Sequence, residues 1–494
     1  MTKRIIAMLA ALLMLLPLAV GCKKKEDVPG ETTVTTTDGG SSGEKVTSRY
    51  DPNSDVLDTL PTTKYGGKEF SIKVAENHYY QFDAEKINGD LANDTLYNWI
   101  NKIEKRYDVD VAVYKGAGWT AYNSEINAEI TAGVDIKNLY GSMAFMAYSG
   151  ILNGMYKNWY GMGDNIDLNT ERWDKEVNDG VTYNGALYGL TGSLGISKMQ
   201  YTMATFYDVE RLDNLGYSTS VLCKMVDDNE WTFENFSRIV KDIYEDLDNS
   251  QTISDGDLFG YVSASGNSLD IWFPAFDISI TSRDNANKIT PTLYTDSNVE
   301  ILTKLCNFYH NNQGVRIFDI TKTSESALFA KGQAAMVSAR FYSAFDEFSQ
   351  MGSDAYGILP LPKLDAGQEH YVSKLNDQYT LWCVAKTLPE SENDFTAHIT
   401  DALCAESSTT VYYQFYDIIL KSRYSKDGNT ARMVDIVMDY VSFDTAIMFG
   451  EYLDGYPYMI RKLIQNNSTD IASEYNGKAE SIKQKLQTVY DCYQ

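Results

Sequence analysis

Polar side chains follow a predicted strand near the start of the folded part of the sequence. Residues 68–74 alternate between polar and apolar side chains, and Glu76, Asn77 and His78 come directly after them. In α/β proteins ligands bind beyond the carboxyl ends of parallel strands. A carboxylate, an amide and an imidazole can hold hydroxyl and amine groups. We therefore predict that these residues bind a polar ligand, with a solvated loop as the alternative.

Further candidates follow later predicted strands. A third strand is expected at residues 136–139, which places Tyr140 and Ser142 just beyond its end. Trp272 and Phe273 follow a loop and are predicted to stack on a ligand, because flat rings pack on the apolar faces of sugars. The 36 Tyr, 19 Phe and 7 Trp favour a saccharide or another polar organic ligand. Trp99, Trp231 and Trp382 are expected in the core, and Trp119 is left open.

Metal and catalytic motifs have little support in the sequence. The four histidines are scattered, and no zinc, nucleotide or nucleophile motif is present, so we predict no metal, no cofactor and no catalytic residue. Four aspartates resemble a calcium loop in their spacing, but the glycine and the terminal glutamate of an EF-hand are missing, which favours a solvated acidic turn. These residues are Asp246, Asp248, Asp255 and Asp257.

Charge and cysteine usage exclude other classes. The net charge of −25 would repel phosphate backbones, so nucleic acid is not an expected partner. Beyond Cys22 the chain has an odd number of cysteines without close pairing, which argues against a disulfide framework.

Alternating elements indicate the fold class. Residues 96–107 carry apolar side chains at helical spacing after a predicted cap at Asn93 and Asp94, and residues 109–113 alternate as a strand. A strand, a helix and a strand in this order predict a βαβ unit with a parallel sheet. Later segments repeat the alternation, among them a helix of residues 233–247 capped by Thr232. The sequence therefore predicts an α/β fold.

The N-terminus has the features of an export signal. Lys3 and Arg4 precede an apolar run at residues 5–20, and residues 18–22 (LAVGC) resemble the lipobox of bacterial lipoproteins. This resemblance implies cleavage after residue 21, a lipid on Cys22 and anchoring at the extracellular face of the cell membrane. An uncleaved membrane anchor is the alternative.

A flexible linker is predicted next. Residues 22–60 are rich in Thr, Gly, Ser and Asp and have no apolar periodicity before Leu57. The remaining chain, about 430 residues, exceeds one ordinary core and predicts two domains or lobes.

Three sequence blocks carry a more specific resemblance. Their order and spacing are similar to those of extracellular solute-binding proteins of ABC importers, in the maltose-binding-protein-like branch. The blocks are residues 93–109, residues 184–190 (NGALYGL) with 230–233 (EWTF), and residues 329–336 (FAKGQAAM) with 356–363 (YGILPLPK). The last pair is the most specific of them.

The resemblance implies a two-lobed periplasmic-binding-protein fold of type II, with a ligand cleft between lobes joined by hinge strands. By analogy, residues 65–193 plus 383–430 form the N-terminal lobe, and residues 194–375 plus 431–494 form the C-terminal lobe. It further implies a monomer that closes on a small solute, with a carbohydrate as the expected class, and delivers it to a permease without any chemistry of its own.

The resemblance also supplies candidate residues. It places Arg340, Phe341 and Tyr342 where the family provides an aromatic contact, although the family more often has Trp in place of Tyr342 and Gly in place of Arg340. An arginine can bind hydroxyls or a carboxylate, which leaves a neutral sugar open to question. The alternative functions are a surface glycan-binding lipoprotein and a glycoside hydrolase with paired carboxylates.

Overall fold

The computed structural model describes residues 50, 54–285, 287–352, 355–423 and 428–493. The predicted signal peptide at residues 1–21, Cys22 and most of the predicted linker lie outside these residues. In the part of the chain that is described, no helix combines the length and the apolar composition needed to cross a bilayer.

The packed structure begins before residue 60, where the linker was predicted to end. A short 3₁₀ helix covers Val56–Thr59, and Leu57 in it is fully buried. Arg106 donates a hydrogen bond of 2.9 Å from Nη2 to the carbonyl oxygen of Leu57. The apolar side chain and the carbonyl of Leu57 together fix this segment against the folded domain.

The first sheet has four strands in the order β13-β3-β1-β2. β1 runs parallel to β2 and to β3, whereas β13 is antiparallel to β3. The bounds are β1 Lys68–Val74, β2 Val109–Lys115, β3 Leu139–Met143 and β13 Thr380–Cys383. The predicted parallel βαβ unit is confirmed, since β1, a helix and β2 follow one another in the chain. We call this sheet with its helices the first lobe.

Helices from distant parts of the sequence cover the first sheet. α1 (Leu91–Tyr107) packs beside α13 (Asn393–Thr409), where Trp99 Nε1 donates to the carbonyl of Leu403 at 2.9 Å. The cap of α1 is Asp90 rather than the predicted Asn93 and Asp94, because its carboxylate accepts the amide of Asn93. The other helices are α2 Trp119–Ala132, α3 Ala144–Leu152 and α4 Lys175–Gly180.

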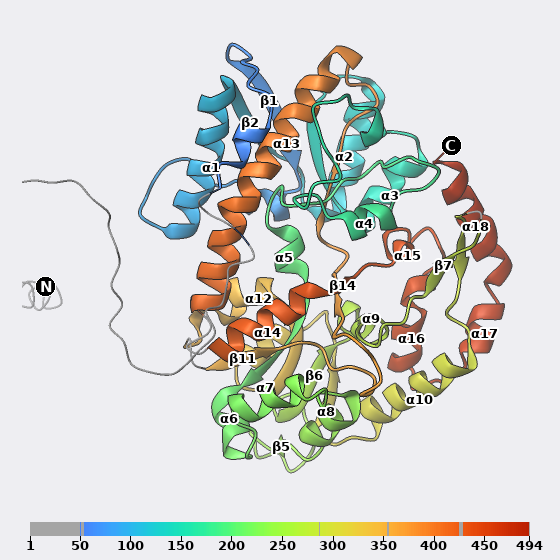
Figure 1. Ribbon diagram of the computed structural model, residues 1–494. Helices are drawn as coiled ribbons and strands as arrows, with labels where there is room; N and C mark the ends of the chain where they lie inside the picture. The colour runs from blue at the N-terminus through green and yellow to red at the C-terminus, as the bar shows by residue number, and fades with distance from the viewer. Residues whose placement is uncertain (1–49, 51–53, 286, 353–354, 424–427, 494) are drawn as a thin grey trace, which may run out of the picture. The chain divides into compact units, whose positions relative to one another are not determined.

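The second sheet has six strands, with the order β11-β4-β10-β6-β5 and β9 paired to β6. β10, β6 and β9 are parallel, and β4 lies antiparallel between β11 and β10. The bounds are β4 Met203–Asp208, β5 Tyr244–Glu245, β6 Leu258–Ala264, β9 Val315–Phe318, β10 Ala334–Arg340 and β11 Tyr356–Leu359. This sheet with its helices is the second lobe, drawn in the lower half of Figure 1.

The helix predicted at residues 233–247 is shorter in the structure. α8 spans Phe233–Val240 with Thr232 as its cap, as predicted. The chain then leaves the helix, and Tyr244 pairs with Phe259 in the ladder between β5 and β6. Strand pairing therefore overrides the helical spacing of the last apolar residues in the pattern.

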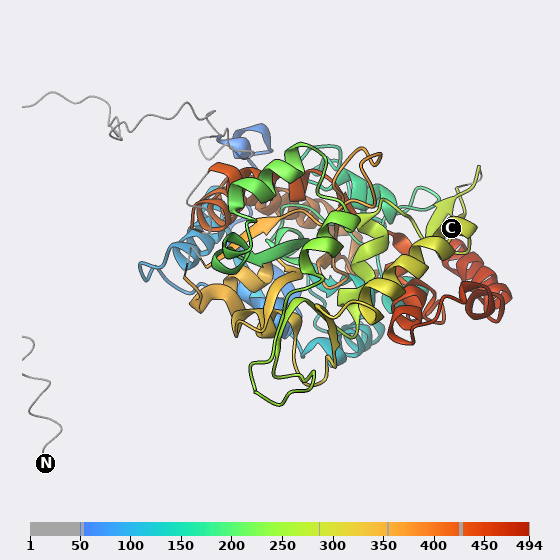
Figure 2. The same cartoon turned by 90° about the horizontal axis from the view of Figure 1, so that it is seen from below.

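Several shorter helices complete the second lobe, and Figure 2 shows them from below. They are α6 Val209–Asn214, α7 Thr219–Asp227, α9 Trp272–Ala275, α10 Asp296–His310, α11 Glu325–Ala330, α12 Tyr342–Phe345 and α14 Gly428–Asp439. A π-helical segment covers Tyr413–Arg423, and a small hairpin joins β7 (Thr281–Arg283) to β8 (Ile289–Pro291).

The chain crosses between the sheets at separate places. α5 (Ser197–Tyr201) leads from the first lobe into β4, and β12 (Ser373–Lys374) leads back towards β13. β14 (Val441–Ser442) pairs with β12 in parallel, which places the crossings side by side. Figure 1 shows α5 between the two sheets. The residue boundaries of the lobes stay a prediction.

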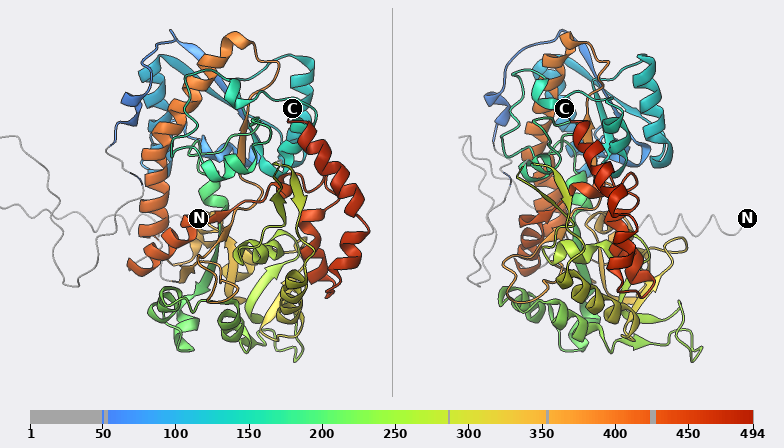
Figure 3. Two further views of the ribbon diagram at one scale, coloured as in Figure 1. Left: turned by 45° about the vertical axis from the view of Figure 1, so that its right-hand side comes forward. Right: turned by 90° about the vertical axis from the view of Figure 1, so that its right-hand side faces the viewer.

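Helices dominate the C-terminal segment, as predicted. They are α15 Thr445–Met448, α16 Met459–Gln465, α17 Ile471–Asn476 and α18 Ala479–Asp491. In the left view of Figure 3 they lie along the right-hand side of the molecule, and in the right view that side faces the viewer. At the end of this segment Tyr493 contacts the rings of Tyr183 and Tyr188, each at 4.9 Å between ring centroids.

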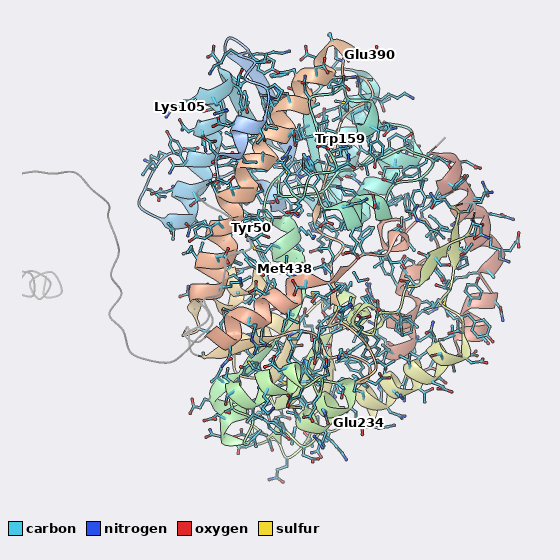
Figure 4. The ribbon with its side chains drawn as sticks, in the orientation of Figure 1. Tyr50, Lys105, Trp159, Glu234, Glu390 and Met438 are labelled. Atoms are coloured by element: carbon cyan, nitrogen blue, oxygen red, sulfur yellow. The ribbon has the colours of Figure 1, made fainter. Side chains whose placement is uncertain are left out.

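Large side chains fill both lobes. Trp159 is buried in the first lobe and donates from Nε1 to the carbonyl of Trp382 at 2.9 Å, and Figure 4 labels it beneath Glu390. Trp99, Trp231 and Trp382 are buried as predicted, whereas Trp119 is 47 % exposed. The thiols of Cys306, Cys383 and Cys404 are free and buried.

Candidate functional site

The first predicted residues lie at the carboxyl edge of the first sheet. Glu76, Asn77 and His78 belong to a 3₁₀ helix, Glu76–Gln81, that follows β1 directly. Glu76 and Asn77 are exposed, and the Asn77 side chain accepts the amide of Trp119 at 3.0 Å. An exposed carboxylate, an amide and a half-exposed indole therefore share this edge.

His78 differs from its two neighbours because it is fully buried. Its Nδ1 lies 2.8 Å from the hydroxyl of Thr380, and its ring centroid lies 5.6 Å from that of Tyr201. Burial lowers the pKa of His78 to about 4, so the imidazole is neutral at physiological pH. The side chain supports the surface above it rather than forming that surface.

Tyr140 and Ser142 lie inside β3 and not beyond its end. The predicted strand at residues 136–139 is shifted, since β3 covers Leu139–Met143. Both side chains are fully buried, and the hydroxyl of Ser142 donates to the side-chain oxygen of Asn123 at 2.8 Å. The Tyr140 hydroxyl accepts the amide of Lys137. The candidate site therefore does not include them.

Trp272 and Phe273 lie in the core of the second lobe. The Trp272 ring packs against Phe233 at 5.0 Å and against Phe308 at 5.6 Å between centroids. Its Nε1 donates to the hydroxyl of Tyr309 at 2.8 Å, which satisfies its one polar atom. No face of the ring is available for stacking on a ligand, so the candidate site omits both residues.

Arg340 ends β10 at the carboxyl edge of the second sheet. Its Nη1 donates to the side-chain oxygen of Gln378 at 2.7 Å, across the boundary between the lobes. The guanidinium carbon lies 5.2 Å from the ring centroid of Tyr201 and 5.7 Å from that of Tyr342. Phe341, between them in sequence, is fully buried against Phe206, so it supports the edge from below.

These contacts define a junction cluster, in which residues of both lobes meet. Tyr80 follows β1, and its ring lies 5.8 Å from that of Tyr342, which follows β10. The rings of Tyr201 and Tyr342 stack at 6.1 Å with an angle of 14°. The junction cluster consists of Tyr80, Gln200, Tyr201, Arg340, Tyr342 and Gln378. The carboxyl edges of the two sheets therefore face each other here.

The electrostatics of the junction cluster keep its phenols neutral. Burial raises the pKa of Tyr342 to about 12 and raises the pKa of Tyr80 well above its usual value. The Tyr80 hydroxyl donates to the side-chain oxygen of Gln200. The cluster therefore offers flat rings, neutral hydroxyls and one permanent positive charge, a set that suits a polyhydroxylated or an anionic ligand.

A second set of charged groups includes Lys374 and Asp377, which lie close in sequence to Gln378 of the junction cluster. Arg461 pairs with Asp270 through Nε, 3.1 Å from each carboxylate oxygen, and Lys374 Nζ lies 3.7 Å from Asp270 Oδ2. Burial lowers the pKa of Lys374 and raises the pKa of Asp377. The paired charges compensate one another at the crossing formed by β12, where the lobes are joined.

Two cavities lie away from the junction cluster. One of about 790 Å³ opens on the second lobe beside β9 and the end of α10. A second cavity, of about 370 Å³, has Tyr50, Lys198 of α5 and Met438 among its lining residues, and Figure 4 labels Tyr50 and Met438. Neither has a residue of the junction cluster in its lining, and the convergence of both carboxyl edges favours the junction as the candidate site.

Most residues of the junction cluster were not predicted from the sequence. Tyr80 and Gln200 are separated by 120 positions and Arg340 and Gln378 by 38, so no local pattern links them. One available signal was the position of Tyr80, four residues after the predicted binding loop begins.

Comparisons with known proteins concern the whole chain. Neither a protein-family sequence model nor a curated protein matches this sequence. Solved structures do match. An ABC substrate-binding protein of Listeria monocytogenes in complex with cycloalternan has a TM-score of 0.53 at 16 % identity, covering 86 % of this chain and 98 % of that one.

Other matches have similar values. Maltose-bound MalE3 of T. maritima has a TM-score of 0.52 at 11 % identity, with 86 % of this chain and 99 % of that chain covered. UgpB of Mycobacterium tuberculosis, in complex with glycerophosphocholine, has a TM-score of 0.53 at 15 % identity, with 86 % of this chain and 99 % of that chain covered. At such identities the likeness shows the fold. The predicted α/β, two-lobed periplasmic-binding-protein fold is confirmed.

Proposed function

We propose that this protein is the solute-binding component of an ABC importer and that it captures a carbohydrate or a related polyol without catalysing a reaction. The observation that carries the proposal is the junction cluster, where Tyr80 from the first lobe meets Arg340 and Tyr342 from the second. Solved proteins with this fold bind cycloalternan, maltose and ribitol.

Capture in this proposal depends on a hinge. The lobes are joined by short crossings, among them α5 and the paired strands β12 and β14. A ligand that contacts both lobes stabilises the closed arrangement by its differential affinity for it. Closure would present a surface that a permease can distinguish from the open form, and the protein would act as a monomer.

The ligand is expected to carry hydroxyls in a planar array, with or without an acidic group. Tyr342 offers a partly exposed ring, which the buried Tyr201 supports from behind, while Arg340 offers a rigid fork of donors. Glu76, Asn77 and Trp119 at the edge of the first sheet would add polar and stacking contacts. A solved protein of this fold binds glycerophosphocholine, so an anionic ligand is compatible with the architecture.

The location follows from the N-terminal sequence. We propose that Cys22 carries lipid and holds the protein at the extracellular face of the cell membrane. The expected result of Cys22→Ala is release of the protein from the membrane fraction. A wild-type protein whose mature N-terminus carries no lipid on Cys22 by mass spectrometry would contradict lipid anchoring and leave the binding proposal unaffected.

A thermal-shift screen tests the binding proposal. A ligand that binds only the folded state at 100 times its Kd stabilises it by about 2.7 kcal/mol, and the panel should contain sugars, polyols and sugar acids. Mass spectrometry of the recovered ligand distinguishes binding from turnover, because a binding protein returns its ligand intact.

The variant Arg340→Ala tests where the ligand binds. It should abolish or strongly reduce the shift, whereas Arg238→Ala, which changes an exposed arginine on α8, should not. A shift that survives Arg340→Ala unchanged would place the ligand away from the junction cluster. Products of hydrolysis in the recovered ligand would contradict the proposal itself.

A further inference from the structure

The loop between β5 and β6 brings three aspartates together. Residues 246–257 connect these strands, and Asp246, Asp248 and Asp257 each offer a carboxylate oxygen, all within 4.8 Å of one another. We call these three residues the acidic triad. It lies in the second lobe and shares no residue with the junction cluster.

Asp257 is the member that a solvated turn does not explain. Its side chain is fully buried, and Oδ2 accepts the hydroxyl of Tyr244 at 2.9 Å and the amide of Ser254 at 2.7 Å. Its other oxygen, Oδ1, is buried and has no hydrogen-bond partner among the described residues. A buried carboxylate oxygen without a partner is costly, and a bound cation would remove that cost.

The other two members are held in place by the loop itself. Asp246 accepts the amides of Ser250 and Gln251, at 3.1 Å and 2.8 Å. Asp248 accepts the amide of Ser250 and the hydroxyl of Ser254. These hydrogen bonds hold the two carboxylates in fixed positions within the loop.

Positive charge is absent from the triad in the described part of the chain. No lysine or arginine there forms an ion pair with any of the three, and the nearby Asp255 pairs instead with Arg316, Oδ1 to Nη2, at 3.1 Å. The negative charge is therefore concentrated and uncompensated.

We propose that the acidic triad binds a calcium ion. Calcium takes oxygen ligands at about 2.4 Å, so two ligand oxygens on one ion are at most about 4.8 Å apart, which the triad satisfies. Calcium accepts irregular coordination completed by carbonyls and water, as a twelve-residue loop can supply, whereas Mg²⁺ requires a near-octahedral set at about 2.1 Å.

The spacing of the aspartates hid this site in the sequence. Asp255 completes the apparent pattern of a calcium loop but turns towards Arg316, and the missing glycine and glutamate argue against an EF-hand. The three other aspartates converge because β5 and β6 pair at the base of the loop. The site therefore depends on strand pairing and not on an EF-hand motif.

Thermal unfolding of the full chain tests the proposal. Calcium at 1 mM should raise Tm above its value in EDTA by about 3 °C or more if Kd is near 10 µM. Asp257→Asn should remove this calcium-dependent rise, and Asp255→Asn, in the same loop, should retain it. The difference between calcium and EDTA cancels any change in the stability of the ion-free variants.

Terbium luminescence provides an independent measurement. Tb³⁺ replaces calcium at oxygen sites, and excitation of Tyr244, whose hydroxyl contacts Asp257, should sensitise its emission. Calcium should quench that emission by displacement, and Tyr244→Phe should reduce it. A wild-type protein whose Tm is the same in calcium and EDTA, or whose terbium signal survives Asp257→Asn, would overturn the proposal. A rise in Tm with Mg²⁺ equal to that with calcium would overturn the choice of ion.

Discussion

The junction cluster and the acidic triad lie at opposite edges of the same sheet. β6 and β10 are parallel, so the loop before β6 lies at the amino edge, while Arg340 at the end of β10 lies at the carboxyl edge. With seven residues in β6, the two regions are roughly 20 Å apart. Both are polar, but the charged group of the first contacts neighbouring side chains, whereas a buried carboxylate oxygen of the second has no hydrogen-bond partner among the described residues.

This difference indicates different uses. In the junction cluster the guanidinium of Arg340 contacts the side-chain oxygen of Gln378 and the rings of Tyr201 and Tyr342. Outside the cluster, Asp270 pairs with Lys374 and Arg461. Such a surface is stable without a ligand and can exchange one. In the triad a buried oxygen lacks a partner, so that region is expected to be complete only with an ion.

The largest effect on stability should come from removing a partner of buried charge near the junction cluster, so that charged groups there lack a partner as in the triad. Asp270→Ala removes the carboxylate that pairs with the buried Lys374 and the partly buried Arg461 and leaves them only the nearby Asp377, which should lower the free energy of unfolding by about 3 kcal/mol. Chemical denaturation measures this. The exposed pair of Lys175 and Asp179 is the control, because Lys175→Ala should cost less than about 1 kcal/mol. Equal losses for both variants would mean that Asp270 is not compensating buried charge.

The second largest effect is expected from acid, which should lower the free energy of unfolding through the buried His78 beneath the junction cluster. His78 has a folded-state pKa of about 4 against 6.5 in the unfolded chain, so below pH 6.5 the unfolded state takes up a proton that the folded state does not. The free energy of unfolding should therefore fall as pH falls from about 6.5 to 4, by up to about 3 kcal/mol. Denaturation at pH 7, 5.5 and 4.5 measures the slope.

The control for this prediction is a pair of variants. His78→Gln should reduce the dependence on pH and leave the part due to His398, whose pKa burial also lowers. His370→Gln, at a half-exposed ring stacked on Tyr440, should leave the dependence unchanged. The triad loop contains no histidine, so a slope that persists undiminished in His78→Gln would move the acid-sensitive region away from the junction.

A smaller effect is expected from the stacking ring of the junction. Tyr342→Ala should weaken ligand binding about 10-fold by removing a ring that stacks on Tyr201, and Tyr342→Phe should weaken it about 2-fold. Isothermal titration with a ligand found in the thermal screen gives both values. Tyr160→Ala, at an exposed ring of the first lobe, is the control. A loss with Phe as large as that with Ala would assign the contact to the hydroxyl instead of the ring.

The smallest expected effect is that of calcium at the acidic triad on the affinity of the junction cluster for its ligand. Because the triad and the junction cluster share no residue and lie at opposite edges, calcium should change the ligand Kd by less than about 2-fold while it raises Tm. Titration of ligand in calcium and in EDTA measures this. A change of 10-fold would show that the ion biases the hinge.

Strong local periodicity made part of the fold predictable. β1, β2 and the start of α8 lie at the predicted positions, because alternation and a capping threonine are local signals. β3 was placed too early. Its residues include Tyr140, Gly141 and Ser142, which lack an alternating pattern because both faces of this strand are buried.

The candidate site was less predictable for a different reason. The position of Arg340 came from a resemblance between sequences, but its partners Gln378 and Tyr201 come from crossing segments far away in the chain. Trp272 shows the opposite error, since a tryptophan after a loop is equally suited to a core or a ligand. Only the packing of Phe233 and Phe308 around it distinguishes the two.

The buried thiols provide a way to follow each lobe separately. Cys383 and Cys404 lie in β13 and α13 of the first lobe, and Cys306 lies in α10 of the second. Burial raises the pKa of all three, which suppresses the reactive thiolate in the native state. Reaction with a thiol reagent therefore requires local opening. Pulsed alkylation followed by peptide mass mapping would report, without any introduced label, whether the two lobes unfold in one step or one after the other.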